Sequence, residues 1–135
     1  MKHTIDLDVD QQWAVIRYHG PVRPDDPVTI LRTLAARPGW TPQCDRIVVY
    51  DDGQLGDLDA AEFRRMRDQL IATHSAIYGE AETFSAQVCR DPMQIPLVAY
   101  WISFGNSFYP AGMQRFDTVE EAKAWLCAQR PWRAG

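Results

Sequence analysis

The chain has little of the positive charge that binds nucleic acid. Its 135 residues include 14 basic and 18 acidic side chains, a net charge of −4, and its only lysines are Lys2 and Lys123. Proteins that bind nucleic acid gather arginine and lysine into a patch or stripe that neutralises phosphates. Because the sequence contains no such stripe, we expect no nucleic-acid partner.

Cysteine is scarce, and no apolar segment is long. Cys44, Cys89 and Cys127 are far apart and form no C-x-x-C pair, a pattern typical of reduced thiols in a cytoplasmic protein. The N-terminal residues lack the apolar core of a signal peptide, and the apolar segment 95–104 is about half of a membrane span. We therefore expect a cytoplasmic protein without a membrane span. Repeats and linker-like composition are also missing, so residues 1–135 are expected to form one domain.

The motifs that identify common enzyme classes are missing as well. The sequence contains no G-x-S-x-G, P-loop, G-x-G-x-x-G or cysteine–histidine signature. Its histidines, His3, His19 and His74, lie on different predicted elements and lack the spacing of a metal site. We therefore predict a protein with no catalytic residue, no cofactor and no bound metal.

What the chain does contain is a regular alternation of strand and helix patterns. Polar and apolar residues alternate in 4–9 and 13–19, which indicates an antiparallel hairpin. The adjacent β-branched residues 47–49 indicate a strand buried on both faces, which requires helices above and below the sheet. The predicted strands are 4–9, 13–19, 46–51, 84–89 and 112–116, and the predicted helices are 28–35, 60–78, 92–106 and 119–130. This order predicts an α/β layered domain with a mixed, mostly parallel sheet of about five strands, an N-terminal antiparallel hairpin and about four helices.

The predicted helix 92–106 is apolar on more than one face. Its start is indicated by Asp91 and Pro92, and its end by Gly105. One side is expected to pack as core, with Leu97, Tyr100, Trp101 and Phe104. The remaining apolar residues exceed what one layer on a sheet needs. We predict that they form a protein interface, most simply a two-fold homodimer, and they are Ile95, Val98, Ile102 and the following Phe108.

A run of acidic residues follows the predicted central strand. Open α/β sheets bind ligands at the carboxyl ends of their strands, which makes this segment a possible ligand or switch loop. An enzyme acting there would need a strongly shifted carboxylate in a cleft, and carboxylates in this loop could also hold a hard cation. The residues concerned are Asp51, Asp52, Gly53 and Asp57.

Turn formation and helix capping explain the same acidic segment more simply. Asp59 is expected to cap the next helix, with Glu62 three residues later as its capping-box partner. A receiver-type phosphoacceptor at Asp51 is disfavoured, because residues 20–21 and 115–116 do not supply the acidic pair and the lysine that it needs.

The order of these elements resembles the STAS fold of SpoIIAA-type proteins, and the last third of the chain is similar to bacterial SpoIIAA-like proteins of the STAS/SEC14-type group. The matching residues are Asp91-Pro92 and the closing pattern F-x-(T/D)-x-x-E-A-x-x-W-L, here residues 116–126. The resemblance implies a SpoIIAA-like fold. SpoIIAA-type switches carry a phosphorylatable serine or threonine after the central strand, and this sequence has neither from 42 to 72. A kinase-driven switch of that kind is therefore not expected.

Two functions are consistent with these patterns. The first is a non-catalytic protein-interaction or regulatory module that associates with itself, or with another protein, through helix 92–106. The alternative rests on the resemblance, because SEC14-type domains hold lipid-like molecules. A binding protein for a small apolar or lipid-like ligand would have an enclosed cavity beside Trp101 and Phe104, lined by aromatic side chains with a few polar groups at its mouth.

Overall fold

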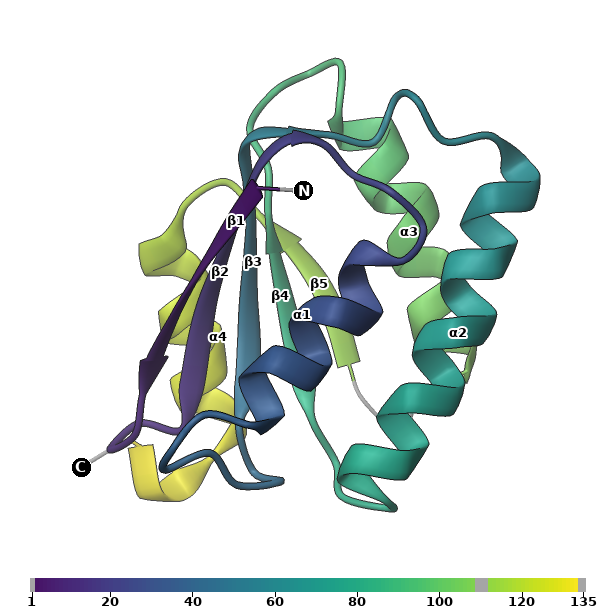
Figure 1. The fold of residues 1–135 in the computed structure, drawn as a ribbon. Coiled ribbons are helices and arrows are strands. Elements are labelled where there is room, and N and C mark those ends of the chain that lie inside the picture. Colours follow the sequence, from purple (N-terminus) through teal and green to yellow (C-terminus); the bar gives the residue numbers. More distant parts are fainter. Residues whose placement is uncertain (1, 109–111, 134–135) are drawn as a thin grey trace.

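The sheet contains five strands in the spatial order β1-β2-β3-β4-β5 (Figure 1). A computed structural model describes residues 2–108 and 112–133. β1 pairs with β2 antiparallel, and every other neighbouring pair is parallel. The strands are β1 (Lys2–Asp8), β2 (Trp13–Pro21), β3 (Asp45–Gln54), β4 (Phe84–Val88) and β5 (Gly112–Phe116). This topology confirms the predicted mixed, mostly parallel sheet with an antiparallel hairpin at its start.

Three helices lie on one face of the sheet and a fourth lies on the other (Figure 1). Connections between parallel strands are right-handed as a rule, and the chain moves in one direction from β2 to β5, so the three connecting helices share a face. The last helix follows β5 and covers the opposite face. The helices are α1 (Asp26–Ala35), α2 (Ala60–Tyr78), α3 (Ile95–Phe108) and α4 (Val119–Gln129), with a short 3₁₀ helix, η1 (Pro131–Arg133).

β3 is the central strand, and its side chains alternate between two cores. Ile47 and Val49 are buried in the core under α4, whereas Tyr50 is buried in the core under α1, α2 and α3. This confirms the prediction, made from the β-branched residues 47–49, that this strand is covered on both faces. β3 extends to Gln54, because β2 continues beside it past the end of β4, with Gly20 opposite Gly53. The expectation that a loop follows the predicted strand 46–51 is therefore wrong for Asp52, Gly53 and Gln54, which belong to β3.

Capping side chains mark the starts of two helices. Asp59 and Glu62 form the predicted capping box at the start of α2, and Thr118 caps α4 with its side-chain oxygen. α3 differs from the prediction, since it begins at Ile95. The preceding residues form a turn in which the Asp91 side chain accepts a hydrogen bond from the Met93 backbone N–H at 2.9 Å.

A buried carboxylate at the start of β3 fixes the C-terminal segment to the sheet. Asp45 is 0% exposed and accepts hydrogen bonds from Arg130 and, at 2.7 Å, from Nη1 of Arg133. Arg133 also donates to backbone carbonyls of Gln11 and Gln12 at the turn of the hairpin. One carboxylate therefore connects the central strand, the hairpin and the end of the chain.

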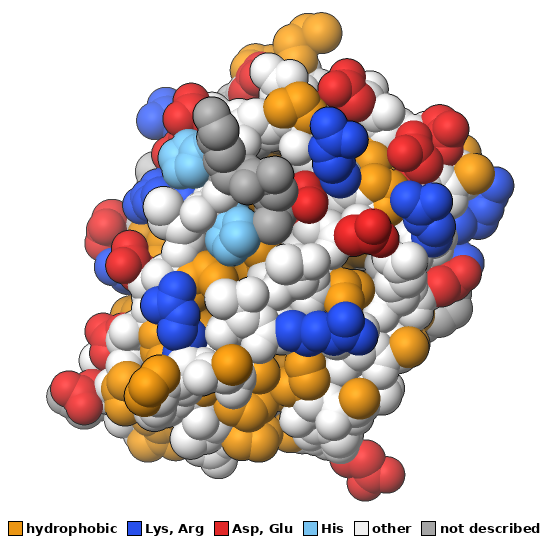
Figure 2. Space-filling view, viewed as in Figure 1, with side chains coloured by type: hydrophobic (Ala, Val, Ile, Leu, Met, Phe, Trp, Pro, Cys, Tyr) orange, Lys and Arg blue, Asp and Glu red, His pale blue; other side chains and the backbone are white. Residues whose placement is uncertain are grey.

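The face that carries α1 and α2 has a mixed charge distribution. Figure 2 shows basic and acidic side chains interspersed over it, with apolar side chains gathered toward its lower edge. Among the residues that the structure describes, no helix has both the length and the apolar character needed to cross a bilayer.

Candidate functional site

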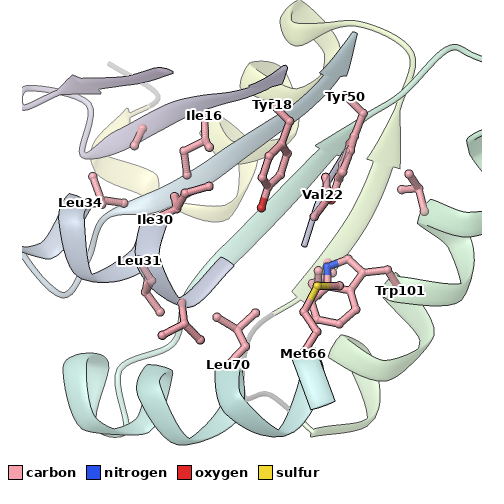
Figure 3. Packing of buried hydrophobic residues seen from close by; sticks show 14 of the residues in the cluster. Ile16, Tyr18, Val22, Ile30, Leu31, Leu34, Tyr50, Met66, Leu70 and Trp101 are labelled. Carbon is pink, nitrogen blue, oxygen red and sulfur yellow. The ribbon is translucent and has the colours of Figure 1, made fainter. Parts of the chain in front are cut away.

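A cavity of about 50 Å³ lies between the sheet and the helices α1, α2 and α3. Most of its wall is apolar, and Figure 3 shows side chains from the sheet and the helices pointing toward one another around it. Met66 and Leu70 come from α2, and Trp101 comes from α3. The sheet supplies Val48 at the centre of β3, which is half-buried because the cavity exposes it.

Polar side chains from the two central strands line the floor of this cavity. Side chains on a strand alternate between faces, so Arg46 of β3 and Ser85 and Gln87 of β4 point to the same side as Val48. The Tyr50 hydroxyl donates to Oε1 of Gln87 at 2.6 Å, and Nε2 of Gln87 donates to Oγ of Ser85 at 2.8 Å. A buried chain of hydrogen bonds thus runs across the sheet at the centre of the core.

Two stacked tyrosines line the cavity. The rings of Tyr18 and Tyr50 lie 5.5 Å apart, and both side chains are buried. An irregularity in the pairing of β2 with β3 lies at this point, and such bulges commonly redirect side chains beside a site. Burial raises the pKa of each hydroxyl above its ordinary value, and Asp26 adds to the effect at Tyr18. Both hydroxyls therefore keep their protons and remain hydrogen-bond donors.

Gly53 provides the space that Tyr18 occupies. A Cβ atom at this glycine would lie 2.7 Å from the Cβ of Tyr18, which is closer than two such atoms can approach. The predicted ligand-loop residue Gly53 therefore contributes to the cavity indirectly, by allowing the ring of Tyr18 to lie over the sheet.

Arg46 is the unusual group in the cavity, because it is a buried cation without a counter-ion. The residue is 9% exposed, and its guanidinium carbon lies 5.5 Å from the centre of the Tyr78 ring. Within the described part of the chain its side chain makes no hydrogen bond or ion pair, and its Nε is buried without a partner. Its charge is felt nearby: burial, and then Arg46, lower the pKa of His74 to about 3.

The acidic residues predicted as a ligand loop do not line this cavity. Asp51 and Asp52 lie on β3 with side chains 68% and 74% exposed, and they pair with Arg17 at 3.3 Å and His19 at 3.5 Å on β2. Asp57 is exposed in the turn before α2. In the ranges 2–108 and 112–133, no group of three or more histidine, cysteine or acidic residues could hold a metal ion. The acidic pair therefore lies open to solvent.

The prediction that Val98 lies on an outer face of the apolar helix is wrong. Val98 is 0% exposed and belongs to the core, while Ile95 and Ile102 are half-buried against that core. Tyr100, predicted to be core, is 40% exposed. The physical reason is that α3 contacts both β5 and α2, so one broad apolar arc centred on Val98 and Trp101 is covered within the chain.

Self-association through α3 stays a prediction, now with less apolar surface to support it. Between Ile95 and Phe104, the part of the helix whose side chains are described, the exposed positions are Pro96, Ala99, Tyr100 and Ser103, which share one stripe. The side chain of Phe108, the last predicted interface residue, lies outside the described residues.

Sequence reasoning missed the polar residues of the cavity. The signal was present in β4, where Ser85 and Gln87 interrupt a short strand that is buried on both faces, and such strands are normally continuous apolar runs. Arg46 gave a second signal, because it lies two residues before Val48 and its charged side chain therefore points to the same face of β3.

Comparison with known proteins identifies the fold. No protein-family model matches the chain, and no curated protein sequence matches it. A solved structure is similar over 93% of this chain and 94% of its own, with a TM-score of 0.56 and 16% sequence identity. That structure is an uncharacterised protein of the DUF3478 family with a SpoIIAA-like fold, from Shewanella loihica PV-4. The predicted SpoIIAA-like fold is thereby confirmed.

Proposed function

We propose that this protein is a non-catalytic binding module of SpoIIAA-like fold that takes a small molecule into the cavity between its sheet and α1, α2 and α3. The observation that supports this proposal is the set of polar groups buried at the centre of an apolar core. Burying a polar group without full compensation costs free energy. A ligand in the cavity would supply the missing partners.

The volume of the cavity limits the size of the ligand. A water molecule needs about 10–15 Å³ of such space, so 50 Å³ accommodates a few water molecules or an organic molecule of comparable size. A lipid chain does not fit in this form of the protein. Of the predicted alternative, a binding protein for a small apolar or lipid-like ligand, the proposal therefore retains the small ligand and not the lipid-like one.

The test is an NMR titration of the ¹⁵N-labelled protein with small organic molecules, both charged and neutral, of up to about six non-hydrogen atoms. Binding in the cavity predicts shifts concentrated on its lining groups, including the indole N–H of Trp101 and the backbone N–H of Gln87. If none of the molecules shifts these resonances in the wild-type protein, the proposed function is wrong.

Two matched variants separate the cavity from the rest of the sheet. Val48→Phe places a ring in the cavity and is expected to abolish the shifts while the protein remains folded. Val15→Phe makes the same change at another half-buried valine of the sheet, beside an open groove between the hairpin and α4, and is expected to leave binding unchanged. Equal binding by both variants would contradict the proposed location.

A further inference from the structure

Arg46 carries a charge that forms no ion pair within the described chain. An arginine side chain keeps its proton in a protein, and an uncompensated buried charge is strongly destabilising. The buried carboxylate nearest in sequence, Asp45, is already bound to Arg130 and Arg133 and belongs to the core on the other face of the sheet. Arg46 is nine-tenths buried and lines the cavity, so a partner placed there would reach it.

The other polar groups in the cavity also offer donors. Ser85 is the direct neighbour of Arg46 in the pairing of β3 with β4. Its hydroxyl oxygen accepts from Gln87, which leaves the hydroxyl proton available. The Tyr18 hydroxyl makes no hydrogen bond within the described ranges and keeps its proton. A guanidinium and two hydroxyls that can all donate form a site for an acceptor-only group, which is an anion.

We propose that the ligand of this cavity is a small monocarboxylate, whose carboxylate pairs with the Arg46 guanidinium and whose short apolar part lies against Met66, Leu70 and Trp101. The inference rests on the proposed function and names the chemical class of its ligand. A carboxylate matches the planar, forked geometry of a guanidinium. One buried cation balances one negative charge, which disfavours a phosphate dianion, and the apolar wall disfavours a purely inorganic ion.

The experiment compares sodium propionate with propionamide, its uncharged counterpart of equal size, at constant ionic strength. The readouts are the Nε–H resonance of Arg46 and the indole N–H resonance of Trp101. Hydrogen bonds to charged groups contribute enough that propionate should bind about 10- to 100-fold more tightly than propionamide. A titration with sodium chloride alone shows whether an inorganic monoanion produces the same shifts.

Each outcome bears on a different step of the inference. Saturable shifts with propionate, absent or much weaker with propionamide and chloride, support the carboxylate site. Equal binding of propionate and propionamide overturns the anion inference and leaves the proposed function standing. Saturation by chloride, with loss of the propionate shifts, overturns the assignment to a carboxylate. Shifts with none of the probes, charged or neutral, overturn the proposed function as well.

A substitution of Arg46 distinguishes a ligand-binding role from a structural one. Arg46→Met removes the buried charge with little change in volume, so the ligand-free variant is expected to have a higher Tm than the wild type and to lose the propionate shifts. Arg65→Met, on the exposed face of α2, is the matched control and should change neither. A folded Arg46→Met protein that melts lower and still binds propionate would overturn the inference. If Arg46→Met does not fold, Ser85→Ala is expected to weaken propionate binding several-fold, and unchanged binding would contradict the site.

Discussion

Removing the charge of Asp45 should destabilise the protein more than removing any exposed carboxylate. The Asp45 side chain has no exposed surface and accepts four hydrogen bonds, three of them from Arg130 and Arg133 and one from the Phe84 backbone N–H at 2.8 Å. Breaking a buried ion pair from one side costs about 3–5 kcal/mol, because the remaining cation stays buried. Against a free energy of unfolding on the order of 5–15 kcal/mol, this is a large fraction. Asp45→Asn is therefore expected to lower Tm by about 10–20 °C.

The assay is chemical and thermal unfolding followed by circular dichroism, with Asp51→Asn as the control. Asp51 is also paired with an arginine, Arg17, but both side chains are well exposed, so the control should lose no more than about 1 kcal/mol. A difference between the two variants that stays below about 1 kcal/mol would show that the buried network does not hold the C-terminal segment to β3.

Three further predictions concern other buried groups. The pKa of His74 is lowered to about 3, so its imidazole stays uncharged in the folded state, whereas in the unfolded state it takes up a proton below pH 6.5. The free energy of unfolding therefore decreases as the pH falls from 6.5 toward 3. In denaturant titrations between pH 7 and pH 4, His74→Gln should lose less of this free energy than the wild type. Burial raises the pKa of Cys44 to about 12 and also raises the pKa of the buried Cys89. Ellman's reagent should therefore modify only the half-buried Cys127 quickly in the native protein. Rapid modification of all three cysteines would contradict the structure. Gly53→Ala should destabilise the protein by about 1–3 kcal/mol in urea titrations, because the new Cβ would collide with the Cβ of Tyr18. An unchanged urea midpoint would show that β2 and β3 accommodate the added methyl group without a loss of stability.

The strand and helix order could be predicted from local patterns, because most elements carry their own signals. Ile47 and Val49 mark the central strand, and Asp59 and Thr118 mark the starts of two helices. The extension of β3 could not be predicted in the same way. Its Asp-Asp-Gly sequence has turn propensity, and only the long-range pairing with β2 holds it as a strand.

The arrangement of α3 shows where a helical wheel fails without tertiary information. At about 100° per residue, Val98 and Trp101 are separated by roughly 60°, so they share a face, although sequence reasoning placed them on opposite faces. The apolar residues form one arc that is wide enough to contact both the sheet and α2. Which part of a wide arc is covered depends on the neighbouring helix, and the sequence of α3 alone does not contain that information.

The two faces of the central strands provide an internal control for the interpretation of the cavity. Toward α4, the centres of β3 and β4 present the apolar side chains of Ile47, Val49, Ala86 and Val88, each at most 3% exposed, and the buried carboxylate at the start of β3, Asp45, is paired with Arg130 and Arg133. The alternate residues of the same strands face α1, α2 and α3, and they include the polar side chains of Arg46, Tyr50, Ser85 and Gln87. On the α4 face the centres of the strands pack through apolar residues and the buried charge at the edge is paired within the chain, whereas the charge of Arg46 on the opposite face has no ion-pair partner among the described residues. Since polar groups at core positions cost stability unless they are satisfied, a binding role explains their presence where the fold alone does not.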